Sequence, residues 1–443
     1  MSAIARLLLE QGLYRISGSD HNLGDVGRAL ADLGAEVFDD HQAAHLGGAD
    51  LVFVSSAIPA DNVEVQAAWA GGIPVIRRPQ VLAWLTQPYR TIGVAGTHGK
   101  TTTTAMIAQL LLRAGEDPSF IVGGVVPGLG TNARAGKGPF FVIEADEYER
   151  TFLALRPSVA VVTNVEMDHP DCYPSYEHVQ AAFTAFVGRV VAGGCVVGCA
   201  DDPGAQSVLA AAPTGHRAIR YGLGMGCDVQ GVAVRSNGPG HDFEAVVGGE
   251  SRGRFSLRVP GLHNVRNALA VLSVAQELQI PDELTREVLA SFGGVARRFE
   301  LKGEVGGVVV VDDYAHHPTE IRATLAAARS RFNERRIWVV FQPHTFSRTQ
   351  ALLEEYQSSF ADADHVLITP IYASRERDER KVSSLDLVRG AQHRDIRCVP
   401  DLQSAITELI RNVTAGDVVL VMGAGDSFRV GEGVLSALQE RTR

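Results

Sequence analysis

A glycine-rich turn that carries a lysine and several threonines lies between a short apolar run and an apolar-periodic segment. The run Thr91–Ala95 leads into Gly-Thr-His-Gly-Lys-Thr at 96–101, and a helical pattern follows at 105–112. A strand, a tight turn and a helix start would gather backbone N–H groups and the positive end of a helix dipole at one point. This arrangement is typical of a polyphosphate site. The alternative is a threonine-rich helix N-cap with an incidental Gly-Lys pair.

A nucleotide in this turn would use the lysine and the first threonine in different ways. Lys100 would neutralise β- and γ-phosphate oxygens, and Thr101 would offer its hydroxyl to Mg²⁺. The longer form of the motif requires glycine at position 94, where this chain has Val94, so we interpret it as a shortened variant. The residues predicted to contact ATP in this turn are Gly96, Thr97, His98, Gly99, Lys100, Thr101 and Thr102.

Acidic residues and a histidine follow the next two apolar runs. Phe141–Ile143 ends in Glu144-Ala-Asp-Glu-Tyr, and Val159–Val162 is followed by Thr-Asn-Val-Glu-Met-Asp-His at 163–169. The carboxyl ends of parallel strands share one edge of a sheet, so these groups are expected beside the phosphate turn. Mg²⁺ prefers oxygen ligands, which makes Glu144 the stronger metal candidate and His169 the weaker. Solvated loop residues or helix caps are the alternative.

Composition narrows the class of protein. The 443 residues are 45% hydrophobic and 21% charged, with a formal net charge of −10. Nucleic-acid and membrane-surface binders need a basic field, so neither class is expected. Apolar stretches of about ten residues are too short for a membrane helix, which needs ~20. The five cysteines lack zinc-type pairing and are predicted to be reduced thiols of a cytoplasmic protein.

The order of short apolar runs and helical patterns indicates the fold class. Strand-like runs alternate with helical segments through most of the chain, which predicts βαβ units and parallel sheets. Between 227 and 260 short alternating runs broken by Gly and Asn predict an antiparallel patch. We expect an α/β protein with three domains at 1–88, 89–297 and 298–443. The first eleven or so residues, with Arg6 and Glu10 in an apolar pattern, predict an amphipathic helix.

These motifs, with others along the chain, resemble those of the Mur ligases of bacterial cell-wall synthesis. The resemblance continues through Gly-Leu-His-Asn-Val-Arg-Asn at 261–267, Ala-Arg-Arg-Phe-Glu at 296–300, Asp-Asp-Tyr-Ala-His-His-Pro-Thr-Glu at 312–320, Phe-Gln-Pro-His-Thr-Phe-Ser-Arg-Thr at 341–349, Ile-Tyr-Ala-Ser-Arg-Glu at 371–376 and Met-Gly-Ala-Gly-Asp at 422–426. It therefore spans almost the whole chain.

The resemblance implies an ATP- and Mg²⁺-dependent ligase with three domains: an N-terminal Rossmann-like UDP-binding domain, a central P-loop-type ATPase with a mixed sheet, and a C-terminal Rossmann-like domain. The motifs at 312–320 and 341–349 are most similar to those of members that join L-alanine to UDP-N-acetylmuramate through an acyl phosphate. Two alternatives stay open. One is the ligase that attaches a ready-made tripeptide in recycling. The pair Glu147-Tyr148 is similar to the corresponding residues of that ligase. The other is a nucleotide-binding regulator without catalysis.

The resemblance also implies residue roles and a physical state. The catalytic residues would be Lys100, Glu144, His169, His344 and Arg348, and the metal ligands Thr101, Glu144 and His169. Asn264 and Asn267 would face the nucleotide base, with Arg298 and Asp313 meeting the nucleotide from the domain boundary. The substrate-binding residues would be Ser17, Ser19, Asp20, Ser55, Ser56, Asn132, Tyr314, His316, His317 and Arg375. Arg348 and Arg375 suit bidentate binding of a carboxylate or phosphate. A monomer or weak homodimer is expected.

One departure from the family pattern lies at the first residues. Family members usually begin with a strand and a loop resembling Gly-Ile-Gly-Gly-x-Gly-Met-Ser, whereas this sequence starts Met-Ser-Ala-Ile-Ala. The pattern therefore predicts either a longer native protein or weak binding of the UDP-sugar. A sheet without a central strand would carry unpaired backbone groups, each costing about 1–3 kcal/mol when buried.

Overall fold

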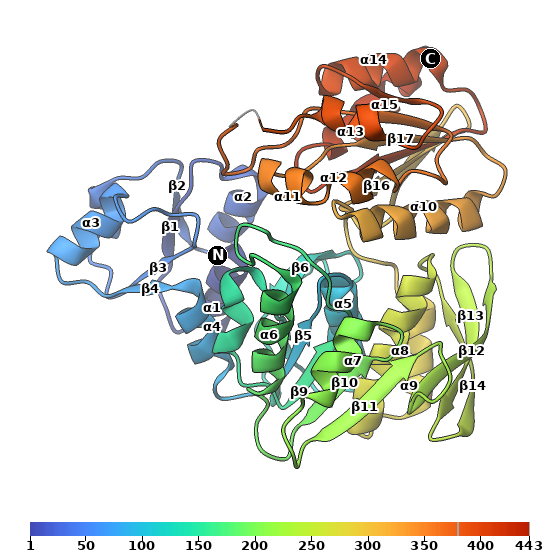
Figure 1. Ribbon diagram of the computed structural model, residues 1–443. Coiled ribbons are helices and arrows are strands. Elements are labelled where there is room, and N and C mark those ends of the chain that lie inside the picture. Colours follow the sequence, from blue (N-terminus) through green and yellow to red (C-terminus); the bar gives the residue numbers. More distant parts are fainter. Residues whose placement is uncertain (379–380, 443) are drawn as a thin grey trace.

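Apolar strands and amphipathic helices build three α/β units in the computed structural model, which describes residues 1–378 and 381–442 (Figure 1). The predicted α/β class with three domains is confirmed. The N-terminal unit lies on one side of the molecule, the central unit lies below, and the C-terminal unit lies above the central one. Among the residues so described, no helix is long and apolar enough to cross a bilayer.

The N-terminal unit holds two small parallel sheets. Its elements are α1 (Ser2–Gln11), β1 (Ser17–Ser19), α2 (Gly24–Asp32), β2 (Glu36–Phe38), the 3₁₀ helix η1 (Ala43–Leu46), β3 (Val52–Val54), α3 (Val63–Ala70), β4 (Val75–Arg77) and α4 (Arg78–Thr86). β1 pairs with β2 and β3 pairs with β4, each pair forming a sheet of its own. A Rossmann-like layer is thus represented by two parallel pairs of three-residue strands rather than one continuous sheet.

Helices α1 and α4 attach this unit to the rest of the chain through apolar side chains. The predicted amphipathic helix is present as α1, which buries Ile4, Leu7 and Leu8. Helix α4 buries Leu82 and Leu85, and all of these side chains belong to the same hydrophobic cluster as the central sheet. The first unit therefore shares its core with the central unit.

The central unit is built on a mixed sheet of ten strands, in the order β14-β13-β12-β11-β10-β9-β5-β8-β6-β7. Its elements are β5 (Arg90–Ala95), α5 (Lys100–Arg113), β6 (Ser119–Val126), β7 (Thr131–Arg134), β8 (Phe140–Glu144), the 3₁₀ segment η2 (Tyr148–Ala154), β9 (Val159–Val162), α6 (Tyr176–Val187), β10 (Cys195–Cys199), α7 (Pro203–Ala210), β11 (Arg217–Gly222), β12 (Val229–Ser236), β13 (His241–Val247), β14 (Glu250–Leu257), α8 (Leu262–Glu277) and α9 (Asp282–Ser291).

The order of strands in this sheet positions the phosphate turn. β5 runs parallel to β8 on one side and to β9 on the other. The loops after β5, β8 and β9 therefore emerge at one edge, as the sequence predicted. The antiparallel patch expected between 227 and 260 is present as β12, β13 and β14, and it extends the same sheet.

The C-terminal unit is a six-stranded sheet in the order β15-β16-β20-β17-β18-β19, parallel except for β15. Its elements are β15 (Glu300–Val305), β16 (Val308–Asp313), α10 (Pro318–Phe332), β17 (Ile337–Phe341), α11 (Phe346–Ala351), α12 (Leu353–Gln357), β18 (His365–Ile368), α13 (Ser384–Gly390), β19 (Ile396–Cys398), α14 (Leu402–Asn412), β20 (Val418–Met422) and α15 (Phe428–Thr442). Separate apolar clusters cover its two faces, as expected for a Rossmann-like sheet.

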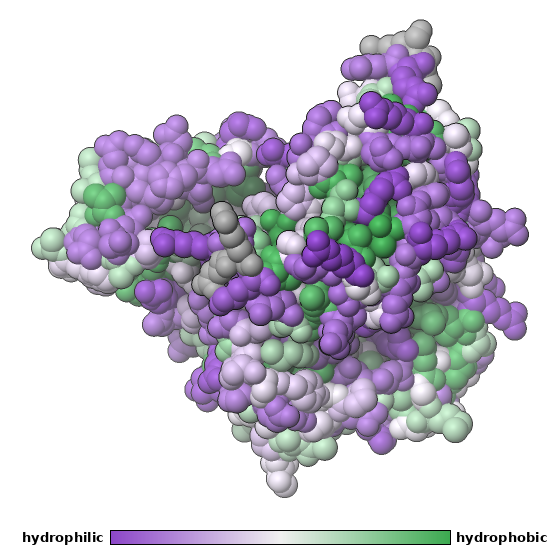
Figure 2. Space-filling view, turned by 45° about the horizontal axis from the view of Figure 1, so that its top comes forward, coloured by the Kyte–Doolittle hydropathy of each residue, from purple (hydrophilic) through white to green (hydrophobic). Residues whose placement is uncertain are grey.

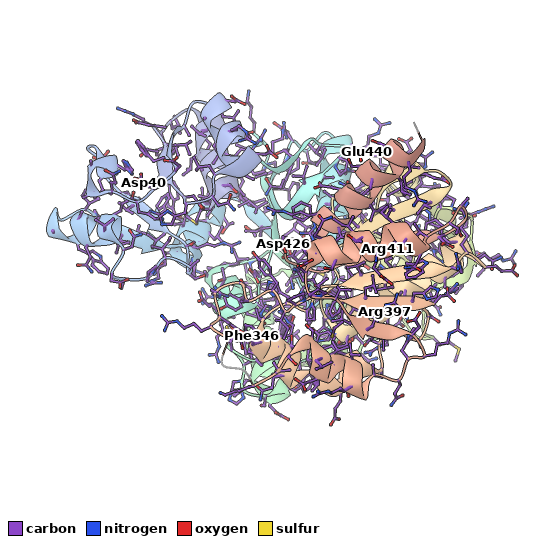
Figure 3. The ribbon with its side chains drawn as sticks, turned by 90° about the horizontal axis from the view of Figure 1, so that it is seen from above. Asp40, Phe346, Arg397, Arg411, Asp426 and Glu440 are labelled. Carbon is purple, nitrogen blue, oxygen red and sulfur yellow. The ribbon has the colours of Figure 1, made fainter. Side chains whose placement is uncertain are left out.

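The surface view shows how these units meet. Most of the visible surface is hydrophilic, and hydrophobic side chains gather in the middle of the molecule where the units come together (Figure 2). In the view from above, Phe346 and Asp426 lie on the side of the C-terminal unit that faces the N-terminal unit, whereas Arg397, Arg411 and Glu440 lie toward its other side (Figure 3).

Candidate active site

The phosphate turn forms because two glycines adopt conformations that other residues avoid. Gly96 has φ 147° and Gly99, which precedes α5, has φ 81°. A Cβ atom on Gly99 would lie 2.7 Å from Oδ1 of Asn267, and one on Gly96 would overlap the hydroxyl of Thr163. Any larger residue at either position would push the turn away from α8 or β9. The backbone N–H groups at the start of α5 thus point into one concave site, as an anion requires.

Lys100 is held inside this turn by acceptors of the protein itself. Its Nζ donates to the carbonyl of Thr97 at 3.0 Å and to Oε1 of Glu147 at 2.8 Å, and it also contacts the carbonyl of Gly96. Burial by itself lowers the pKa of Lys100, but the carboxylate of Glu147 and its acidic neighbours outweigh burial and raise the pKa. The lysine is therefore a permanent cation at the mouth of the turn.

Thr101 and Glu144 form an oxygen pair beside the lysine. The Thr101 hydroxyl lies 3.1 and 3.0 Å from the two carboxylate oxygens of Glu144, and the N–H of Gly123 donates to Oε2 at 2.7 Å. A hydroxyl and an oriented carboxylate fit the ligand preference of Mg²⁺. The structure brings these two predicted metal ligands together.

His169 lies further along the same edge, away from that oxygen pair. It has the left-handed φ of 52°, and its Nε2 is 3.8 Å from Oε1 of Glu147. Its Nδ1 accepts from the guanidinium of Arg348 at 3.4 Å. These contacts lead to Glu147 and Arg348, and the grouping of His169 with Thr101 and Glu144 as metal ligands stays a prediction.

A cavity of about 360 Å³ opens from the phosphate turn toward the C-terminal unit. Eight residues predicted to contact the nucleotide line it: His98, Gly99, Thr101, Thr102, Asn264, Asn267, Arg298 and Asp313. The two amides are already engaged, because Asn264 donates to the carbonyl of Pro260 at 2.7 Å and Asn267 donates to Oδ1 of Asn264 at 3.1 Å. They fix the start of α8 against the phosphate turn. Burial raises the pKa of Asp313 to about 6.

The boundary of the central and C-terminal units, here called the seam, carries a buried ionic network around His98. The ring lies between two carboxylates, with Nδ1 3.2 Å from Glu320 and Nε2 3.4 Å from Glu166. Burial lowers the pKa of His98, but these two carboxylates outweigh it and raise the pKa to about 9. His98 is therefore an imidazolium that joins the phosphate turn to α10. It also lines the cavity, so its predicted contact with the nucleotide stays a prediction.

His98, Glu166 and His317 have ligand atoms within 4.8 Å of one another, which raises the question of a metal. His317 accepts from the N–H of Thr319 at Nδ1, 3.2 Å, and its Nε2 lies 3.1 Å from the carbonyl of Met167. Both nitrogens are thus in use, and His98 is protonated. The chemistry of this donor set fits an ion-pair network better than a cation site. His317 is 4% exposed and its ring anchors α10 to the central unit, and its predicted contact with substrate stays a prediction.

Arg348 crosses the seam to a buried carboxylate. Its Nε donates to Oδ1 of Asp168 at 2.7 Å, and the two side chains are 5% and 6% exposed. Burial raises the pKa of Asp168, but the guanidinium outweighs it and holds the pKa well below its usual range. Nη1 of Arg348 lies 3.1 Å from Nδ1 of His344, and Nη2 lies 3.4 Å from Nδ1 of His169. This guanidinium is occupied by protein groups, and its role as a substrate clamp stays a prediction.

Other predicted substrate residues surround this network. Tyr314 lies under the guanidinium groups of Arg297 and Arg298, at 5.1 and 5.0 Å from its ring centre. His316 lies next to His344, with ring centres 5.9 Å apart. Arg375 is exposed and lies 4.4 Å above the ring of Tyr148, so it bridges the C-terminal and central units.

The predicted UDP-side residues lie in or just after strands of the N-terminal unit. The Ser19 hydroxyl donates to Glu64 at 2.6 Å, and Asp20 accepts from the N–H of Asn22 at 2.9 Å. Ser17 is exposed in β1, and Ser55 and Ser56 follow β3. Asn132 is on β7, the edge strand of the central sheet that contacts α1. Asp40, in the same unit as Ser19, lies across from the C-terminal unit in the view from above (Figure 3).

Four residues of the site were not predicted as functional: Glu64, Glu147, Glu166 and Glu320. Each accepts from residues that are distant in sequence, such as Glu147 from Lys100 and Glu166 from the Thr319 hydroxyl at 2.7 Å. Glu320 carried a local signal, since it lies three residues after His317 in a capping box at the start of α10. The other partnerships depend on tertiary structure.

Comparisons with known proteins agree with the geometry. The Mur ligase family catalytic domain matches residues 1–90, the Mur ligase middle domain matches 94–275, and the Mur ligase glutamate ligase domain matches 297–425. A UDP-N-acetylmuramate–L-alanine ligase of Salinibacter ruber is 45% identical over 443 residues, which cover 99% of this chain and 93% of that protein.

Two solved structures are similar over nearly the full length. A UDP-N-acetylmuramate–alanine ligase from Thermotoga maritima has a TM-score of 0.82 at 28% identity, covering 100% of this chain and 97% of that chain. A murein peptide ligase from Psychrobacter arcticus has a TM-score of 0.76 at 26% identity, covering 99% and 96%. The resemblance seen in the motifs is thereby confirmed, and the chain belongs to the Mur ligase family.

Proposed function

We propose that this protein is an ATP-dependent ligase that joins L-alanine to the lactyl carboxylate of UDP-N-acetylmuramate. One observation carries the proposal: the phosphate turn, the Thr101–Glu144 oxygen pair and the cavity at the seam are contiguous, and two units contribute to them. The relative from Salinibacter ruber, similar over 99% of this chain, is named for the same pair of substrates.

The reaction consists of two transfers that conserve atoms and charge. A carboxylate oxygen of the muramate attacks the γ-phosphorus of ATP, and ADP leaves. The neutral amine of alanine then attacks the acyl carbon, the bond from that carbon to the phosphate oxygen breaks, and the departing phosphate takes up one amine proton. Because the amine and the phosphoryl group must be brought together and kept from water, contributions from two units are expected.

The residues of the turn have defined roles in the first transfer. When ATP binds, Lys100 turns from the carboxylate of Glu147 to the phosphate oxygens, so the lysine charge has an anionic partner in both states. Thr101 and Glu144 would hold Mg²⁺, which when bound offsets the charge of the phosphates. The N–H of Gly123 keeps the Glu144 carboxylate pointed at Thr101. His98 fixes the outer side of the turn to α10.

Amine-dependent release of phosphate tests the proposal directly. Purified protein is incubated with ATP, Mg²⁺ and UDP-N-acetylmuramate, and phosphate is measured with L-alanine, with the tripeptide L-alanyl-γ-D-glutamyl-meso-diaminopimelate, or with no amine. Release with L-alanine, together with a product heavier by one alanyl residue, is the expected result. Release with the tripeptide alone would contradict the proposed substrate.

The tripeptide-recycling reaction is the second candidate. Tyr148 follows Glu147 as in recycling ligases, and the murein peptide ligase from Psychrobacter arcticus is similar in structure. A regulator without catalysis is the third, and it predicts ATP binding with no phosphate release for any amine. The same assay, combined with an equilibrium measurement of ATP binding, separates all three.

A further inference from the structure

Two neighbouring histidines of the C-terminal unit differ in their hydrogen-bond partners: one ring faces a donor and the other faces acceptors. His344 follows β17 and His316 follows β16, so both lie at the carboxyl edge of the sheet, where ligands of α/β sheets bind. Their ring centres are 5.9 Å apart. A chain of contacts leads from the phosphate turn to this pair: Lys100 to Glu147, Glu147 to His169, His169 to Arg348, and Arg348 to His344.

The partner of His344 is a donor. Nη1 of Arg348 lies 3.1 Å from Nδ1 of His344. A guanidinium has only N–H groups and does not lose its charge in proteins, so the imidazole atom that faces it must be an acceptor. The single proton of a neutral His344 is therefore on Nε2. Across residues 1–378 and 381–442 no hydrogen bond occupies that Nε2–H, which leaves it available to a ligand.

The partners of His316 are acceptors. Its Nδ1 lies 3.0 Å from the carbonyl oxygen of Tyr314 and 3.3 Å from Oε2 of Glu320. Both atoms can only accept, so the proton of His316 is on Nδ1 and its Nε2 keeps a lone pair. Within the described part of the chain, that Nε2 is also without a hydrogen-bond partner.

Burial keeps both rings neutral. Burial, with the charge of Arg348, lowers the pKa of His344 to about 4, and burial lowers the pKa of His316 to about 3. The backbone also constrains the first ring, because Thr345, a β-branched residue, has the left-handed φ of 65°. This turn brings Arg348, four residues after His344, against the ring. The ring of His344 stacks on Tyr372, with centres 5.7 Å apart.

We propose that His316 and His344 act as a fixed pair of opposite tautomers. In this pair the bare Nε2 of His316 accepts a hydrogen bond from the amine of the amino-acid substrate, and Nε2–H of His344 donates to an oxygen of the acyl phosphate. Arg348 and Glu320 are the positioning residues that set the two tautomers. The inference rests on the proposed function for its ligands. The two tautomers themselves do not depend on that function.

The pair would align the two reacting groups. An amine that donates one N–H to His316 has its lone pair directed elsewhere, toward the acyl carbon. A donor at a phosphate oxygen offsets the charge that grows there as the bond to the acyl carbon breaks. Neither ring gains or loses a proton in this scheme. His344 is thus a donor and not the base that removes the proton of the amine.

Nitrogen NMR of ring-labelled histidine tests the tautomers without any turnover. Spectra of the wild type, His344→Gln and His316→Gln assign the two rings by the signals that disappear. At pH 7 to 8 we expect the proton of His344 on Nε2 and the proton of His316 on Nδ1. The same tautomer in both rings, or a doubly protonated ring, would overturn the inference.

Turnover of matched variants tests the role of His344. In His344→Gln the amide N–H reaches the place of Nε2–H, whereas His344→Leu fills the space without a donor. We expect kcat within about tenfold of wild type for the first and at least ~10²-fold lower for the second. Equal losses in both would mean that His344 is a base, and no loss in either would mean that it is not involved.

His316→Leu provides the complementary test. It should raise KM for alanine by at least as large a factor as it lowers kcat, because the amine loses its acceptor in the bound state as well. An unchanged KM for alanine would overturn the role of His316. Thermal unfolding of each variant checks that it is folded. Should wild-type protein release no phosphate with any amine, the proposed function fails, while the NMR result still decides the tautomers.

Discussion

The central unit is joined to its two neighbours by contacts of different chemistry. Toward the C-terminal unit, the seam consists of ion pairs and hydrogen bonds at fixed distances, including Arg348 with Asp168 and His98 with Glu320. Toward the N-terminal unit, α1 and α4 insert apolar side chains such as Leu8 and Leu85 into the central core. Ion pairs therefore dominate the boundary beside the phosphate turn. Apolar packing dominates the other boundary, which is also crossed by a hydrogen bond from the N–H of Ala135 to Glu10 at 2.8 Å and by an ion pair of Arg78 with Asp146 at 3.6 Å.

This difference has an energetic meaning. Each large apolar side chain buried at α1 or α4 contributes about 1.5–3 kcal/mol to the free energy of unfolding. This contribution decreases gradually as the packing around the side chain loosens. A buried ion pair has a desolvation cost that its partner must offset, so it gives little net stability when complete and a large penalty when broken. The ion pairs of the seam thus add little stability when all of them are formed, and the loss of one partner lowers the stability strongly.

Breaking the buried ion pair of the seam should have the largest effect. Asp168→Asn leaves the charge of Arg348 in a site that is 5% exposed, and we expect a loss of about 3–5 kcal/mol in the free energy of unfolding. Urea denaturation measures it. The control is Asp25→Asn in the exposed pair with Arg28, expected to cost less than about 1 kcal/mol. Equal losses in the two variants would show that the seam is not special.

Removing the cation of the phosphate turn should remove most of the turnover, and it also leaves the buried carboxylate of Glu147 without this partner. Lys100→Ala is expected to lower kcat by ~10²–10³-fold, equivalent to about 2.7–4 kcal/mol of transition-state stabilisation. Initial rates of amine-dependent phosphate release measure it. Arg113→Ala, at the other end of α5 and exposed, is the matched control and should keep its rate. A Lys100→Ala enzyme with near-normal turnover would contradict the placement of ATP.

The charge of His98 should make the seam sensitive to alkaline pH. The folded pKa of about 9 exceeds the usual 6.5, so the contribution of His98 is complete below pH 6.5 and is lost as pH rises through about 9. We expect His98→Gln to cost on the order of 2 kcal/mol at pH 6 and much less at pH 10. Unfolding in urea at several pH values measures the difference. A difference that stays constant with pH would refute the protonated bridge.

The smallest effect should appear on the N-terminal side. Glu64→Gln weakens the acceptor for the Ser19 hydroxyl and for the N–H of Gln42 at 3.2 Å. The expected loss is about 1 kcal/mol, or roughly fivefold in KM for UDP-N-acetylmuramate. KM for ATP should stay the same. Equal changes in both constants would mean that the two sides of the molecule are coupled more strongly than their contacts suggest.

The sequence was most informative where function depends on local order. A strand, a glycine turn and a helix predicted the positions of Lys100 and Thr101, and the alternation of strands predicted that Glu144 would lie beside them. These inferences need only the rule that parallel strands deliver their loops to one edge. The α/β class and the antiparallel patch followed from periodicity in the same way.

The sequence was least informative about which side chains become partners across the boundaries between units. Arg348 was predicted to clamp a substrate, yet Asp168, 180 residues away, takes its guanidinium. His317 was predicted to bind substrate, and its Nε2 lies 3.1 Å from the carbonyl oxygen of Met167 across the seam. Such pairings depend on how separate units dock. The left-handed φ of Thr345 is equally hidden, since a β-branched residue gives no local signal for it.

The apolar attachment of α1 and α4 constrains the motions of the molecule. Close-packed aliphatic side chains can slide past one another by small distances while they stay buried, which is the behaviour of a shear interface. Hydrogen bonds of 2.7 Å, such as the one between Arg348 and Asp168, permit no such sliding. We therefore expect small continuous shifts of the N-terminal unit on the central unit, and movement of the C-terminal unit only when the ion pairs of the seam break.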